Sequence, residues 1–402
     1  MTQTERASST GSRPLAARIV LGRSIAPVPL EFLLVASSAT LLTAFGIVMV
    51  FSATTVESLT QSGSPFNDGI SHLIYAAVGL PMMFVMSRFS VRWLQRIAWP
   101  VFVLGVVLQL LVFTPLGHEF GGNRNWLFIG GMTIQPSEFL KVSLVLWIAF
   151  ILHRKSAALT RFWQFAIPIL PGAAFAIATV LGGRDLGTAT IMAMLALGTL
   201  FFAGVRLRFL MPVVLVGAAG VAALAIFNEN RMTRILSVFN PDCDPTAECF
   251  QPYHALWGLA GGGLLGRGLG NSREKYNWLP AAADDYIFAI VGEELGMLGC
   301  LVVLGLFAVL AVGIFRIVRR SDDIFVRAAA GGIGVWIAGQ ALVNVGVVLR
   351  VLPALGVPLP FLSAGGSSLI AVLIACGVLL ALARTLPDGK APVGAVPSRS
   401  AS

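Results

Sequence analysis

Charged side chains are scarce in this chain of 402 residues. Only 12% of the residues are Asp, Glu, Lys or Arg, whereas 56% are hydrophobic, and the mean hydropathy is strongly positive. A soluble protein of this length carries about twice that proportion of charge. The hydrophobic residues also gather into runs of roughly 18–25, long enough to cross about 30 Å of hydrocarbon as a helix. The composition therefore excludes an ordinary soluble protein and predicts an all-α polytopic membrane protein.

Cysteine and histidine are also rare, with four of each. No Cys/His cluster or paired-carboxylate spacing demands a metal, so the sequence predicts no metal ligands and leaves a divalent cation (Mg²⁺ or Mn²⁺) as an option. Cys300 and Cys376 fall in hydrophobic runs, as inert core cysteines do. Cys243 and Cys249 lie in a polar connection, either as free thiols or as a small disulfide ring. In an oxidising compartment we favour the disulfide, which would stabilise the folded state by about 2 kcal/mol.

Hydropathy predicts ten transmembrane helices joined mostly by short connections. If the N-terminus is cytoplasmic, most of the 28 Lys and Arg residues fall in alternate connections and the two ends, as the positive-inside rule requires. Both termini are then cytoplasmic. The predicted spans are 32–53, 70–87, 97–114, 134–152, 164–182, 187–204, 209–227, 286–316, 326–349 and 366–384.

The ends of the chain have a different composition from the predicted membrane domain, residues 31–385. Residues 1–30 are rich in Ser, Arg and Pro, without the apolar core of a signal peptide, and 386–402 are similar, so both are expected to be disordered cytoplasmic tails. The net charge of +9 follows from the membrane topology. Because that charge is spread over alternate loops without an aromatic-studded patch, no nucleic-acid partner is expected.

One connection, residues 228–285 on the outer face, is far longer than the others, and a loop this long in a compact bundle is either functional or disordered. Its six large aromatic residues argue against disorder, and its middle is expected to form a short amphipathic or re-entrant helix. The glycine-rich stretch GGGLLGRGLGNSREK lacks the GK[ST] ending of a nucleotide loop. Beside Arg267, Arg273 and Lys275 it is either a phosphate or pyrophosphate site or a flexible surface loop.

Ionisable residues inside or beside predicted spans form a second group of candidates. Glu138 and Lys141 stand three residues apart and share a helix face, so they either form a structural salt bridge or line a functional cavity. Asp185 follows Arg184 at a short outer turn. The proline-rich stretch LPALGVPLPFLSAGGSS prevents regular helix and is either a cavity lining, with Ser367 among its hydroxyls, or a stiff connector.

Four acids stand in the stretch WLPAAADDYIFAIVGEELG, at the start of the eighth predicted span. Asp284 and Asp285 either cap the following helix or act as a base, and each would raise the other's pKa. Glu293 and Glu294 are expected to lie roughly 12–14 Å deeper along the same helix, too far to share the proton of Asp285. We expect them to pair with or orient other groups of the bundle.

Taken together, these motifs resemble the SEDS (shape, elongation, division, sporulation) family of bacterial cell-wall proteins, the FtsW and RodA type, with the FtsW branch the nearer. The resemblance covers most of the chain. The segments that carry it, in order, are QPSEFLK (135–141), DLGTA (185–189), GGLLGRGLGNSREKYNWLP (262–280), DDYIFAIVGEELG (284–296) and NVGVVLRVLPALGVPLPFLSAGGSS (344–368).

The resemblance implies a peptidoglycan glycosyltransferase that polymerises lipid II on the outer face of the cytoplasmic membrane, with undecaprenyl pyrophosphate as the leaving group. The family's essential acid aligns with Asp285, which the resemblance makes the general base or the binder of the acceptor hydroxyl. Asp284, Glu293, Glu294 and Asp185 are expected to support it. The side chains expected to bind the lipid-linked substrate are those of Lys275, Arg273, Arg267, Glu138, Lys141, Arg124 and Ser367.

Several positions depart from the family pattern. Ala281 and Ala283 stand where Glu and His are common, and Asn125 stands where an Arg is usual, with Arg124 beside it. Arg350 replaces a typical Gly and Ala364 a typical Tyr. These changes leave the expected base in place but remove side chains to which the family pattern would assign a role.

The resemblance also implies partners: lipid II, undecaprenyl-pyrophosphate-linked glycan, a cognate class B penicillin-binding protein, other division proteins and membrane lipid. The expected location is the bacterial cytoplasmic membrane at the division septum. Two rival functions fit the same ten spans. The chain could instead be a flippase that moves lipid II across the membrane, or a scaffold that recruits a penicillin-binding transpeptidase.

Overall fold

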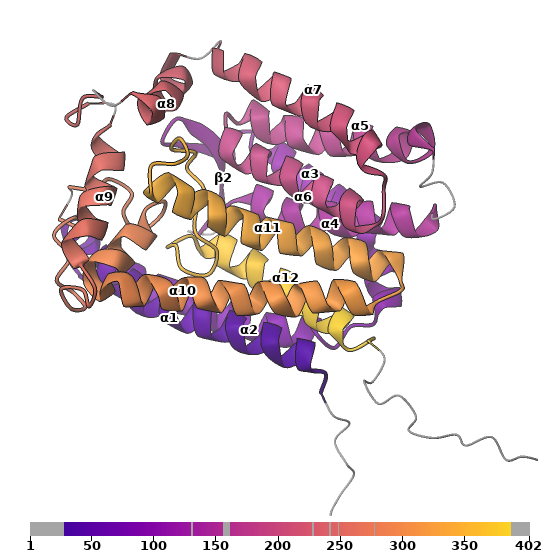
Figure 1. Ribbon diagram of the computed structural model, residues 1–402, viewed down its shortest axis with the longest axis horizontal. Coiled ribbons are helices and arrows are strands. Elements are labelled where there is room, and N and C mark those ends of the chain that lie inside the picture. Colours follow the sequence, from indigo (N-terminus) through magenta and orange to yellow (C-terminus); the bar gives the residue numbers. More distant parts are fainter. Residues whose placement is uncertain are drawn as a thin grey trace, which may run out of the picture.

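A computed structural model describes residues 28–129, 132–155, 161–226, 229–240, 243–247, 249–276 and 278–386. Nearly all of the regular structure is helical (Figure 1). The predicted tails, 1–30 and 386–402, lie almost wholly outside the described residues. The helices are α1 Leu30–Ser62, α2 Asn67–Met86, α3 Val91–Leu111, α4 Pro136–Arg154, α5 Phe162–Gly182, α6 Leu186–Phe202, α7 Leu207–Ile226, α8 Glu229–Phe239, α9 Phe250–Gly262, α10 Ile287–Arg320, α11 Ile324–Val348 and α12 Gly366–Ala383.

The hydrophobic helices match the predicted spans. In the part of the chain that the structure describes, eight helices are long and apolar enough to cross a membrane, and α6 and the Leu207–Gly220 part of α7 are shorter apolar helices. Together they correspond to the ten predicted spans. Helices α4 and α12 are buried on almost every side, and the others surround them with one face outward. The central position suits α4, because its charged Glu138 and Lys141 would be costly against lipid and instead face the interior of the bundle.

The long connection before α10 is structured, as expected. It contains α8 and α9, and α9 forms the helix predicted in its middle, although it begins at Phe250 and ends at Gly262. This part of the molecule lies at one end of the bundle, whereas α1 begins and α12 ends near the opposite end (Figure 1). The arrangement is what ten crossings with one large loop on the far side would produce.

A small sheet between α3 and α4 was not predicted. Strands β1 (Gly117–Phe120), β2 (Asn123–Ile129) and β3 (Met132–Ile134) pair antiparallel in the order β1-β2-β3. The turn between the first two strands is Gly121-Gly122, with φ of 59° and 82°. Two adjacent glycines able to adopt positive φ are a recognised hairpin signal, which the hydrophobic runs that predict membrane spans do not reveal.

The eighth span departs from the prediction of one helix over 286–316. Helix α10 breaks at Gly296, whose φ is 68° and ψ −166°. The loop after α9 fills the break, since the backbone N–H of Met297 donates to the carbonyl oxygen of Gly263 at 2.9 Å. A Cβ at Gly296 would lie 2.4 Å from the backbone nitrogen of Gly266, so only glycine fits. Glu293 and Glu294 therefore stand near the end of the short helix that begins at Ile287, just before the break.

Candidate functional site

Asp285 stands in a tight turn just before α10. The backbone N–H groups of Asp284 and Asp285 both donate to the carbonyl oxygen of Ala281, at 3.2 and 3.0 Å. Ala281 has a φ of 55°, the left-handed region that costs a non-glycine residue conformational energy. The N-cap position of α10 is Tyr286, without a side-chain cap. The capping role considered for the two aspartates is therefore wrong, and both carboxyls remain available for other chemistry.

The surroundings of the two aspartates disfavour their charged forms. Asp284 is exposed to solvent and Asp285 is partly exposed. Protein atoms nevertheless surround both residues on their other sides and displace much of the bulk water. Removal from bulk water, followed by the charges of Asp284 and Asp185, raises the pKa of Asp285 to about 7. Burial, followed by the charges of Glu57 and Asp68, raises the pKa of Asp284 to about 6. A carboxyl with a pKa near neutrality is suited to accept a proton from a hydroxyl group.

Arg234 of α8 is a neighbour of Asp285 that sequence reasoning missed. Its positive charge opposes the upward shift of the Asp285 pKa, so its guanidinium lies within electrostatic range of the carboxyl. Arg234 itself is exposed. Its position in the long outer loop was visible in the sequence, but no spacing linked it to Asp285, 51 residues away.

Asp185 acts electrostatically on Asp285 and is itself affected by the ion pair in α4. Its carboxylate caps α6 by accepting a hydrogen bond from the N–H of Thr188 at 2.8 Å. Burial raises the pKa of Asp185, and Glu138 adds to the effect while Lys141 opposes it. Lys141 and Glu138 are themselves paired at 2.9 Å, with 2% or less of each side chain exposed. Asp185 is therefore within electrostatic range of Asp285, and Glu138 and Lys141 are within electrostatic range of Asp185.

Ser367 and Arg124 each contact backbone. The hydroxyl oxygen of Ser367 accepts a hydrogen bond from the N–H of Gln135 at 3.1 Å, which joins the start of α12 to the start of α4. The guanidinium of Arg124, on β2, donates to the carbonyl oxygen of Thr114 at 3.0 Å. Both contacts hold elements together, and a role in substrate binding for these two side chains stays a prediction.

The predicted basic cluster forms a second, separate group with the two glutamates of α10. Lys275 pairs with Glu294 at 3.3 Å, and Arg267 pairs with Glu293 at 2.9 Å. Glu293 also accepts hydrogen bonds from the backbone N–H groups of Arg273 and Glu274 and from the hydroxyl of Ser272. Pairing of these glutamates with other groups, as expected, is confirmed. Their partners turn out to be the basic residues that had been assigned to the substrate.

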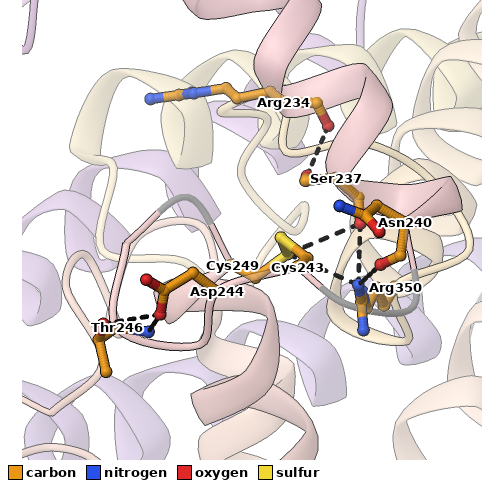
Figure 2. The surroundings of a disulfide bond; sticks show 8 residues. All are labelled: Arg234, Ser237, Asn240, Cys243, Asp244, Thr246, Cys249 and Arg350. Carbon is orange, nitrogen blue, oxygen red and sulfur yellow. Dashed lines mark hydrogen bonds between the residues drawn. A yellow bond between two sulfur atoms is a disulfide. The ribbon is translucent and has the colours of Figure 1, made fainter.

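The disulfide between Cys243 and Cys249 is present in the loop between α8 and α9. Figure 2 shows Arg350 beside it, donating to the carbonyl oxygens of Ser237 and Asn240 at 2.8 and 2.9 Å. Arg350 has a φ of 57°, which explains why glycine is typical at this position. The arginine found here instead ties the end of α8 to the segment after α11.

Metal ligands are not concentrated anywhere in the described ranges. Those residues contain no group of three or more His, Cys, Asp or Glu side chains placed to hold an ion. The neighbouring carboxyls of Asp284 and Asp285 could contribute to a hard cation such as Mg²⁺, but they do not form a complete site.

Comparison with known proteins places this arrangement in a family. Residues 32–387 match the family model described as "Cell cycle protein", which covers FtsW, RodA and SpoVE. The chain belongs to this family.

Curated relatives match most of this chain. The chain is 37% identical to the probable peptidoglycan glycosyltransferase FtsW of Mycobacterium tuberculosis, over 97% of this chain and 74% of the relative. It is 36% identical to the stage V sporulation protein E of Bacillus subtilis, over 88% of this chain and 97% of the relative. As in the rest of the FtsW/RodA/SpoVE family, the hydrophobic helices make this chain a multi-pass membrane protein.

Solved structures share the fold. The rod shape determining protein RodA of Thermus thermophilus superposes with a TM-score of 0.63 at 25% identity, covering 87% of this chain and 95% of that one. A chain from a structure titled "Structural coordination of polymerization and crosslinking by a peptidoglycan synthase complex" superposes with a TM-score of 0.70, also at 25% identity, covering 87% and 96%.

Proposed function

We propose that this protein is a peptidoglycan glycosyltransferase that polymerises lipid II, with Asp285 as the general base. The supporting observation is Asp285 itself. It stands at the position that the resemblance gives to the family's essential acid, in the turn just before α10, with its pKa raised to about 7. A group with this pKa is ionised in a substantial fraction of molecules at neutral pH and binds a proton readily.

The reaction is a single displacement. Asp285 accepts the proton of the 4-hydroxyl of the incoming lipid II sugar as the oxygen attacks the anomeric carbon of the growing glycan. The bond from that carbon to the pyrophosphate oxygen breaks, and undecaprenyl pyrophosphate leaves with the electron pair. One glycosidic bond forms with inversion, and the proton remains on Asp285 until solvent removes it. Because negative charge develops on the leaving pyrophosphate, cationic groups are needed near it.

The accessible guanidinium groups are the best candidates for that role. Lys275 is buried and paired with Glu294, so moving it to a substrate would leave a buried charge unpaired. Arg273 is exposed and donates its backbone N–H to Glu293, and Arg234 is exposed within electrostatic range of Asp285. We assign the pyrophosphate to Arg273 and Arg234, with Arg267 and Lys275 holding the loop that carries Arg273.

Membership of the family supports a membrane orientation, a cellular location and partners for this protein. Asp285 would face the outer side of the bacterial cytoplasmic membrane, both termini the cytoplasm, and the protein would act at the division septum. A class B penicillin-binding protein and other division proteins would be its partners, in line with the structural neighbour from a peptidoglycan synthase complex.

The decisive experiment is glycan synthesis from purified lipid II by the purified protein with its penicillin-binding partner. Asp285→Asn should abolish polymerisation, whereas Asp284→Asn should retain it. A protein in which Asp285→Asn polymerises normally would exclude the proposed base. Transport of lipid II across liposomes without polymerisation would instead identify a flippase, and activity of the partner that depends on this chain only for recruitment would identify a scaffold.

A further inference from the structure

Asn344 holds the turn that carries Asp285. Its side chain is buried on α11, and its amide nitrogen donates to the carbonyl oxygen of Asp285 at 2.7 Å and to that of Val357 at 2.9 Å. A primary amide has two N–H donors, so both are used. Val357 follows Gly356, where a Cβ would lie 3.7 Å from a carboxylate oxygen of Asp285. One side chain therefore fixes the Asp285 backbone against the loop that its carboxylate faces.

The two preceding carbonyl groups of the turn are held from the same side. The carbonyl oxygen of Asp284 accepts a hydrogen bond from the hydroxyl of Ser363, and that of Ala283 accepts one from the N–H of Ala364 at 3.1 Å. The Ser363 hydroxyl oxygen also accepts from the N–H of Leu359 at 2.8 Å. Three consecutive carbonyls of the turn are thus anchored by α11 and the segment that joins it to α12.

Gln340 makes an equivalent contact one helical turn before Asn344. Its amide nitrogen donates to the carbonyl oxygen of Pro358 at 2.8 Å, and its amide oxygen accepts from Lys141 at 3.0 Å and from the indole N–H of Trp336 at 2.8 Å. Residues four apart share a helix face, so the two amides hold adjacent carbonyls of one loop. The buried Lys141–Glu138 pair is thereby connected to the support of Asp285.

We propose that Asn344 is a positioning residue for the glycosyl transfer, acting through the backbone of Asp285. The inference rests on the proposed function. The direction of the Asp285 side chain is set by its own backbone, which Asn344 orients relative to the loop at Gly356. Without the amide, two buried carbonyls lose their donor and the turn can move. A misplacement of about 1 Å at a reacting group costs on the order of 100-fold in rate.

The test compares Asn344→Leu with wild type as full-length protein with its partner, using lipid II as substrate. Leucine has nearly the same shape and lacks the donors. We expect kcat to fall on the order of 100-fold, with the KM for lipid II within about twofold because Asn344 does not touch substrate. The acidic limb of the pH–rate profile should also shift, since the environment of the Asp285 carboxylate changes. A residue with a purely structural role would alter neither kcat at saturating substrate nor the pH profile of the folded fraction.

Gln109→Leu is the matched control. Gln109 is a buried amide on α3 that shares no hydrogen bond with this network, so its replacement should leave kcat and the pH profile unchanged. Asn344→Gln keeps the amide one methylene farther out and should recover part of the lost kcat. It also keeps the proposal testable if Asn344→Leu does not fold.

The outcomes separate the two proposals. If Asp285→Asn is inactive while Asn344→Leu keeps wild-type kcat and pH profile, the positioning role is wrong and the proposed function stands. If Asn344→Leu does not fold, wild-type kcat and pH profile in Asn344→Gln lead to the same conclusion. A loss of thermal stability alone, with unchanged kcat, would likewise overturn it. If Asp285→Asn is active, the proposed function itself fails.

Discussion

Lys275 and Glu294 form a buried ion pair that joins the large outer loop to α10. The ammonium lies 3.3 Å from the carboxylate, with 3% and 0% of the two side chains exposed. The same ammonium donates to the carbonyl oxygen of Gly270 at 2.6 Å, and the hydroxyl of Ser52 on α1 donates to Glu294 at 2.7 Å. The pair therefore couples three parts of the chain at the break in α10.

Lys275→Met should destabilise the protein strongly, because it leaves the carboxylate of Glu294 buried without its cation. Removal of one partner from a buried pair costs about 3–5 kcal/mol. Arg267→Met is the matched comparison, since 32% of the Arg267 side chain is exposed and its loss should cost less. Denaturant unfolding in detergent measures both. Equal losses of unfolding free energy for Lys275→Met and Arg267→Met would show that the burial of an ion pair does not determine the cost of breaking it.

The rate of polymerisation should depend on the ionisation of Asp285. Because its pKa is raised from 3.8 to about 7, the base is protonated at low pH and kcat/KM should rise with pH to a plateau above about 7. Asp284→Asn removes a carboxylate that raises this pKa, so the limb should move to lower pH. A profile of kcat/KM from pH 5 to 9 for both proteins tests this. An unchanged limb in Asp284→Asn would show that the two carboxyls are not coupled.

The same shift predicts the sign of a stability effect. The folded state favours protonated Asp285, so this group stabilises the fold below pH 3.8, and the contribution is lost as the pH rises through about 7. Asp285→Asn stays neutral at every pH. Its free energy of unfolding should therefore fall less than that of wild type between pH 4 and 8, measured by denaturant titration. A steeper fall in the free energy of unfolding for Asp285→Asn than for wild type would contradict a raised pKa of Asp285 in the folded state.

Loss of the Cys243–Cys249 disulfide should have a modest effect. The bond closes a short ring, and the chain-entropy model gives about 2 kcal/mol for such a loop. Cys243→Ser together with Cys249→Ser should lower the melting temperature in non-reducing buffer. Cys300→Ser, a change at a thiol outside the loop, serves as the control. Mass spectrometry that finds both loop thiols free to alkylate would reject the bond itself.

Variants of the Glu138–Lys141 pair distinguish a structural from a functional role. Lys141→Met should destabilise the protein by about 3–5 kcal/mol, because Glu138 is left charged in a buried site. Adding Glu138→Gln removes that charge and should restore folding. If polymerisation returns with folding, the pair is structural. If the double variant folds but remains inactive, the pair takes part in the reaction.

Local signals in the sequence predicted one contact of this region that the structure contains. The pair Glu138–Lys141 followed from helical spacing, whereas the role of Asp285 followed from a family motif and stays a prediction. The spacing of Asn344 and Gln340 also indicates a relationship, because two amides four residues apart in an apolar run share one helix face. They were missed because nothing in the run shows which backbone groups that face will meet.

Other features depended on contacts between distant segments. The break at Gly296 requires the loop after α9 to approach within a distance that only glycine permits. The pairing of Lys275 and Arg267 with Glu294 and Glu293 depends on the same approach. The order of residues along the chain does not show that these segments meet. The sequence therefore predicts that the basic residues bind a substrate.

By itself, the sequence determined the ten hydrophobic helices, the large structured loop and the family motifs. These follow from runs long enough to cross a bilayer and from short-range order along the chain. Only the tertiary structure decided which charges neutralise one another and which remain beside Asp285. The physical reason is that buried charges must find partners wherever the chain brings them together. For Asp285, the carboxylate of Asp185 comes from the start of α6 and the supporting amide of Asn344 comes from α11.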